Sequence, residues 1–107
     1  MILRSAILIG QIADDRAEIF DRFMQRKVVP ALRRYPRIRK VTLRRHLERD
    51  DDCPPVLMQV DMLFDTFEDM RHALASQEWH DAHEVIASGF GDFRGTVTHM
   101  VCDLLVE

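Results

Sequence analysis

The chain has 107 residues, a length suited to one domain, so we predict a single domain over 1–107. Its 47% apolar and 31% charged residues are typical of a globular protein, and no apolar run approaches the roughly 20 residues of a membrane span. The two cysteines, Cys53 and Cys102, are too few for a disulfide framework or a four-cysteine metal site. We therefore expect a reduced, cytoplasmic protein that does not bind membranes.

Charge is unevenly distributed along the chain. Residues 1–49 carry 13 basic and 5 acidic side chains, whereas residues 50–107 carry 2 basic and 13 acidic ones. The halves therefore have net charges of +8 and −11, which sum to the −3 of the whole chain. Two interpretations follow: the halves neutralise each other across the fold or an oligomer, or the basic half presents a patch to an anionic partner.

The first half predicts a strand, a helix and a second strand. Residues 2–11 are rich in Ile and Leu and lack a cleavage site, which favours a strand over a signal peptide. Apolar residues at helical spacing predict a helix over 16–35, with Asp15 as its N-cap. Pro30 lies inside this helix, and its missing N–H predicts a kink or a restarted last turn. Residues 38–48 alternate well enough to predict a second strand.

The second half predicts a strand, two helices and a final strand. Acidic residues and two prolines mark 50–55 as an exposed loop, and the alternation that follows predicts a strand over 56–64. Thr66 and Ser76 are placed to cap helices over 67–75 and 77–88. Residues 96–106 predict the last strand.

This order, βαββαβ, is that of the ferredoxin-like fold. We therefore predict an α+β domain with an antiparallel sheet and its helices on one face. The uncovered face, if partly apolar, is expected to be buried by a second copy of the chain.

Several segments resemble the EthD-like family of the dimeric α+β barrel superfamily. The segments are Phe20–Lys40, Phe64–Met70, Ala73–Trp79 and Asp103–Glu107. The resemblance implies a homodimer in which two sheets face one another, with a small pocket between sheet and helices or inside the barrel. It also implies small-molecule chemistry, since members include lactone isomerases, polyketide-type cyclases, cofactor-free oxygenases and auxiliary degradation proteins.

The first helix departs from the family pattern. Members often carry histidines there, one of them just before the proline, whereas the matching positions here are Phe23 and Val28. Neither side chain transfers a proton, so chemistry that depends on those histidines is not implied for this chain.

Strand alternation predicts which polar side chains share the face opposite the helices. If Met58, Val60, Met62 and Phe64 face the helices in one strand, and Met100, Cys102 and Leu104 in another, the opposite rows form a polar group in the dimer core. This group comprises Gln59, Asp61, His99 and Asp103, joined by Arg4, Arg44 and His46. We predict His99 as a general base with Asp61 beside it, and Arg44, His46 and Asp103 as ligand-binding residues. The alternative is a set of buried, mutually satisfied polar groups at a dimer interface.

A second cluster lies on the helix over 77–88. His83 and Trp79 share the edge of its apolar stripe and are predicted to line the pocket, together with Phe23 of the first helix. His80, His83 and Glu84 have metal-ligand spacing, but no third or fourth ligand is evident beyond the helix, so we predict neither a metal nor a cofactor.

The functional hypotheses come from different classes. The first is a cofactor-free isomerase or oxygenase acting on an aromatic-derived or alicyclic catabolite; the alternative is a non-catalytic auxiliary or ligand-binding protein of a degradation pathway. Whether the chain is an enzyme is left open. The central strands lack the aromatic side chains on which RNA bases stack, so we expect a small hydrophobic or aromatic-derived ligand and no nucleic acid.

Overall fold

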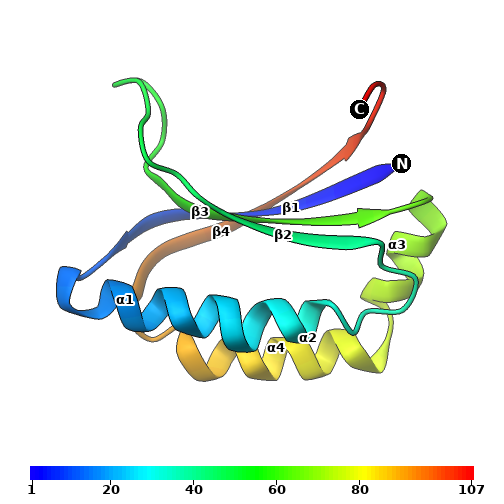
Figure 1. Cartoon of the computed structure of the whole chain (residues 1–107), viewed down its shortest axis with the longest axis horizontal. Helices are drawn as coiled ribbons and strands as arrows, with labels where there is room; N and C mark the ends of the chain where they lie inside the picture. The colour runs from blue at the N-terminus through cyan, green and yellow to red at the C-terminus, as the bar shows by residue number, and fades with distance from the viewer.

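The computed structural model describes residues 1–107 as a four-stranded antiparallel sheet with helices on one face (Figure 1). The strands run in the order β2-β3-β1-β4. Their bounds are β1 Ile2–Ile12, β2 Lys40–Arg45, β3 Val56–Phe64 and β4 Phe93–Asp103. The helices are α1 Asp14–Phe23, η1 Met24–Val28, α2 Val29–Leu32, α3 Phe67–Leu74 and α4 Gln77–Gly89. This arrangement confirms the predicted ferredoxin-like α+β fold.

The first helix is interrupted where the sequence predicts it. Its middle is a π-helical segment, η1, and a short α-helix, α2, restarts with Pro30 in its first turn. Proline has no N–H to donate, so a helix tolerates it best in a first turn, where that donor would be unpaired. The predicted N-cap, Asp15, is wrong: the helix begins at Asp14 after Ala13, whose side chain forms no capping bond.

The predicted caps of the other two helices are confirmed. Thr66 Oγ1 accepts a hydrogen bond of 3.1 Å from the backbone N–H of Asp69, and Ser76 Oγ accepts one of 3.3 Å from that of Trp79. Each cap satisfies a donor that the first turn leaves unpaired. The Ser76 cap fixes the start of α4 and therefore the position of Trp79.

The last strand starts three residues earlier than predicted, because two glycines pair across β1 and β4. Gly10 and Gly95 are partners in the ladder, with φ values of 148° and 159°. A Cβ on Gly10 would lie 2.1 Å from the Arg94 carbonyl oxygen, so the two backbones approach too closely for any larger residue. Both strands continue past this glycine pair and bend toward the helical layer (Figure 1).

The core lies between the sheet and the helices. The predicted row on β3, Met58, Val60, Met62 and Phe64, is buried against the helices, as expected. Met24, Val28 and Leu32 meet it from the helical side. The β2–β3 hairpin and the C-terminus rise from the other side of the sheet, which no helix covers (Figure 1).

Four ion pairs join the basic half of the sequence to the acidic half. They are Arg16–Asp92, Arg37–Asp69, Arg39–Asp65 and Arg44–Asp61. Part of the charge asymmetry is thus neutralised within the fold. No helix is long and apolar enough to span a membrane.

Candidate ligand-binding cavity

A cavity of about 240 Å³ opens between the sheet and the helical layer. Twelve of its sixteen lining residues are apolar, and a thirteenth, Tyr35, adds an aromatic ring that carries a hydroxyl. The apolar wall includes Ala6, Leu8, Met24, Val28, Leu32, Val60, Met62, Leu74, Trp79, Ile86, Phe90 and Val97. An apolar wall with a few polar groups is typical of small-molecule sites.

Four polar side chains line this cavity, and we refer to them as the polar quartet: Arg4, Tyr35, His83 and His99. They come from β1, the end of the first helix, α4 and β4. Tyr35 is buried and Arg4 is half-buried, whereas His83 and His99 are more exposed. The cavity therefore runs from a solvent-accessible pair of imidazoles to a buried phenol.

Arg4 is the cation of this cavity and has no carboxylate beside it. Its Nε is buried and forms no hydrogen bond. No Asp or Glu lines the cavity. Burial lowers the pKa of the Arg4 guanidinium, yet an arginine stays charged at neutral pH. An unpaired buried donor on a charged group lowers the stability of the fold, so an anionic partner that accepts a hydrogen bond from Arg4 would be favoured here.

Tyr35 and His99 are both held neutral at physiological pH. Burial raises the pKa of the Tyr35 phenol to about 12, against a smaller opposite effect of the Arg4 charge. Burial lowers the pKa of His99, and the charges of Arg4 and His83 lower it further. The cavity therefore offers a phenol O–H donor and a neutral imidazole that can accept a proton.

His83 is oriented by Trp79. The two rings stack with centroids 3.7 Å apart, and His83 Nδ1 lies 2.8 Å from the Trp79 carbonyl oxygen. A carbonyl only accepts, so Nδ1 donates to it and Nε2 is the ring nitrogen left for another partner. Both His83 and Trp79 line the cavity, and their role in ligand binding stays a prediction.

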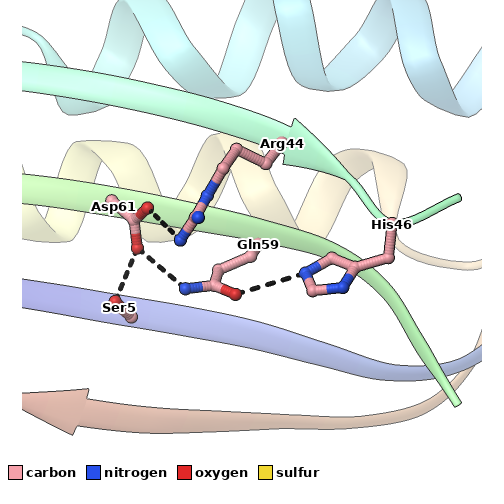
Figure 2. A network of polar contacts seen from close by, with 5 residues as sticks. All are labelled: Ser5, Arg44, His46, Gln59 and Asp61. Carbon is pink, nitrogen blue, oxygen red and sulfur yellow. Dashed lines mark hydrogen bonds and ion pairs between the residues drawn. The ribbon is translucent and has the colours of Figure 1, made fainter. Parts of the chain in front are cut away.

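The opposite face of the sheet holds a separate polar network centred on Asp61 (Figure 2). Asp61 is buried and accepts hydrogen bonds from Ser5 Oγ at 2.5 Å and Gln59 Nε2 at 3.1 Å. Arg44 Nη2 lies 2.6 Å from its other carboxylate oxygen. His46 Nε2 extends the network to Gln59 Oε1 at 3.2 Å. Both carboxylate oxygens of Asp61 are thus paired within the chain.

The predicted juxtaposition of His99 with Asp61 is wrong. His99 pairs with Ala6 in the ladder and faces the cavity, whereas Met100 pairs with Ser5 and lies on the face of Asp61. The row Met100 and Cys102 therefore faces away from the helices. The error arises because β4 is an edge strand on which nearly every residue is exposed, so apolar alternation there does not record which face is buried.

The other predicted site residues divide between the two faces and the periphery. Arg44 and His46 lie in the Asp61 network, as predicted, but Arg4 lies in the cavity rather than beside them. Asp103 is exposed at the end of β4, in the same row as His99, and does not line the cavity. Phe23 packs against Phe20 and Phe90 beside a separate surface hollow.

Tyr35 is the cavity residue that the sequence did not single out. It is the last residue of the helix predicted over 16–35, and its ring fits the apolar spacing of that helix. Its hydroxyl was the available signal, because a buried phenol usually has a hydrogen-bond partner.

The clearest group of potential metal-ligating side chains lies away from the cavity. Asp50, Asp52 and Cys53 have ligand atoms within 4.8 Å of one another in the exposed β2–β3 hairpin. Exposed acidic groups are common without a metal, so this cluster does not identify a metal site.

Solved structures show the same fold in other proteins. An EthD (ethyl tert-butyl ether D) family protein from Bacillus halodurans superposes with a TM-score of 0.75 at 19% sequence identity, covering 98% of this chain and 100% of that one. SnoaB from Streptomyces nogalater, a cofactor-independent oxygenase, gives a TM-score of 0.60 at 18% identity, covering 99% and 93%. A dimeric protein of unknown function and ferredoxin-like fold from Bacteroides fragilis gives 0.60 at 14% identity, covering 96% of each chain.

Sequence comparison adds no closer relationship. No protein-family model and no curated protein matches the chain. The identities of the structural neighbours are low, so the likeness establishes architecture and not activity. The predicted resemblance to EthD-like proteins is thus confirmed at the level of the fold, and the chain has the ferredoxin-like α+β architecture of these proteins.

Proposed function

We propose that this chain binds a small, mainly apolar molecule in the cavity between sheet and helices and transfers a proton on it without a cofactor. The observation that carries the proposal is the polar quartet at one otherwise apolar cavity. Perturbed titratable groups that converge on a cleft favour an active site over a packing defect. A cofactor-independent oxygenase among the structural neighbours supports the cofactor-free part of this proposal, although an oxygenase catalyses a different reaction.

His99 is the proposed proton acceptor. Its neutral imidazole lies at the cavity, within electrostatic reach of Arg4 and His83. In the proposed step, His99 takes a proton from a carbon next to a carbonyl, and the electron pair moves onto the carbonyl oxygen. Return of the proton to another carbon completes an isomerisation. Tyr35, as a neutral phenol, is available to donate a hydrogen bond to the oxyanion.

The alternative is a non-catalytic ligand-binding protein. It is favoured by Val28, which lines the cavity at a position where EthD-like proteins often carry a histidine. This alternative retains the binding cavity and removes only the proton transfer, so one assay can separate the two.

Deuterium uptake separates catalysis from binding. A panel of small lactones and aromatic ketones is incubated with the protein in D₂O, and C–H exchange is followed by NMR. We expect the wild type to accelerate exchange on at least one compound, and His99→Gln to reduce that rate at least about 100-fold. His72→Gln, an exposed histidine on α3, is the matched control and should exchange normally. Ligand binding without any catalysed exchange would instead favour the non-catalytic alternative.

The proposed assembly is a homodimer that buries the uncovered sheet face. This face carries the exposed Met100 beside the half-buried Leu3 and Ile7, and a structural neighbour is described as dimeric. Native mass spectrometry tests this proposal: a mass of twice 12.6 kDa supports it, and a stable monomer contradicts it.

A further inference from the structure

We propose that the molecule bound in the cavity is a small organic acid, held as its anion by Arg4 with its apolar body against the helix-facing side chains. This inference rests on the proposed function and adds the substrate class. It is carried by a cavity whose cationic side chain has no anionic partner.

Arg4 differs from the two arginines of β2, and also from Arg94 of β4, which is exposed and can be solvated without a partner. Arg44 and Arg45 of β2 pair with Asp61 and Asp21, respectively. Both are exposed and could be solvated without a partner, yet each has a carboxylate. Arg4 is less exposed than either, has an unpaired buried Nε and points into a cavity without Asp or Glu. The least exposed arginine of the sheet thus has no carboxylate in the chain, and a ligand carboxylate supplies the missing partner.

The other polar side chains of the cavity are compatible with a ligand that carries a single negative charge. Tyr35 and His99 are neutral at physiological pH, and His83 is at the exposed end of the cavity. A single guanidinium therefore sets the net charge of the inner cavity. A monoanion neutralises it, whereas a dianion would leave one charge among apolar side chains.

The cavity volume limits the apolar body. An apolar cavity of about 150 Å³ is enough to hold benzene. The cavity here measures about 240 Å³, which leaves space for one ring and a carboxylate. Single-ring aromatic or alicyclic acids are therefore the substrate class that fits both the size and the charge.

Benzoate and its neutral isostere benzamide test this inference. Trp79 is the only tryptophan and lines the cavity, so its fluorescence reports binding there. We expect the wild type to bind benzoate at least about tenfold more tightly than benzamide, since only the acid pairs with Arg4. Arg4→Met should remove this preference, and Arg4→Gln, which keeps a polar side chain, should remove most of it. Arg34→Met deletes an exposed arginine of the same charge and should keep the preference.

The outcomes separate this inference from the proposed function. Equal binding of benzoate and benzamide by the wild type would overturn the organic-acid inference and leave a neutral ligand in the same cavity. An acid preference that survives Arg4→Met would also overturn it. If neither compound changes Trp79 fluorescence but a lactone or ketone of the exchange panel does, the organic-acid inference fails and the proposed function stands. If no compound of either set binds, both fail.

Discussion

The two faces of the sheet differ in whether their buried charged side chains are paired within the chain. On the uncovered face, Asp61 accepts from Ser5 and Gln59 and pairs with Arg44, so its charge is compensated within the chain. On the helix-covered face, Arg4 has a buried Nε without a partner. A satisfied network contributes stability, whereas an unsatisfied charge lowers it and is retained where binding requires it. This difference supports a structural role for Asp61 and the proposed binding role of Arg4.

Asp61→Ala should have the largest effect on stability. The change leaves Ser5, Gln59 and Arg44 without their shared acceptor, which should lower the free energy of unfolding by about 2–3 kcal/mol. Urea denaturation measures the loss. Asp65→Ala is the matched control, because Asp65 is exposed and its ion pair with Arg39 should contribute less than about 1 kcal/mol. Equal losses in the two variants would contradict the structural role of Asp61.

Tyr35 should titrate far from the usual range of a tyrosine. It is the only tyrosine, so phenolate absorbance reports on it alone, and we expect a pKa of about 12 in the folded chain. Because the folded-state pKa is raised, its contribution to stability is complete below pH 10.0 and is lost as the pH rises toward about 12. Urea-unfolded protein is the control and should titrate near 10. A folded-state pKa of 10 would mean that the phenol is solvated rather than buried.

Arg4→Met should have a smaller effect of the opposite sign to that of Asp61→Ala. Methionine fills much of the same space without a charge to desolvate, so the free energy of unfolding should rise by about 1 kcal/mol. The same variant should lose its preference for acids, which would show that stability is given up for binding. Destabilisation by Arg4→Met would indicate that the guanidinium is paired in solution and would weaken the contrast between the faces.

The fold was predictable because its signals are local and repeated. The alternation of Met58, Val60, Met62 and Phe64, the caps Thr66 and Ser76, and the restart at Pro30 each depend on residues close in sequence. The boundary of β4 depends instead on contact between Gly10 and Gly95, which are distant in sequence. No pattern of neighbouring residues predicts this close approach of β1 and β4.

The candidate site was predictable only in part. His83 and Trp79 were located because α4 has a definite apolar stripe, and Asp61 because β3 is buried on one face. His99 was placed on the wrong face because an edge strand exposes both of its rows. Arg4 was placed on the wrong face as well, because the side of the sheet that it faces is set by tertiary packing.

The most direct test of the account is to find which face of the sheet binds the ligand. Methionine methyl groups labelled with ¹³C provide reporters on both sides, since Met24 and Met62 line the cavity and Met100 lies on the uncovered face. On addition of benzoate, we predict that the NMR signals of Met24 and Met62 shift in a saturable manner while that of Met100 stays in place. Shifts at Met100 without shifts at Met24 and Met62, or no shift at any of the three, would contradict the assignment of the cavity as the binding site.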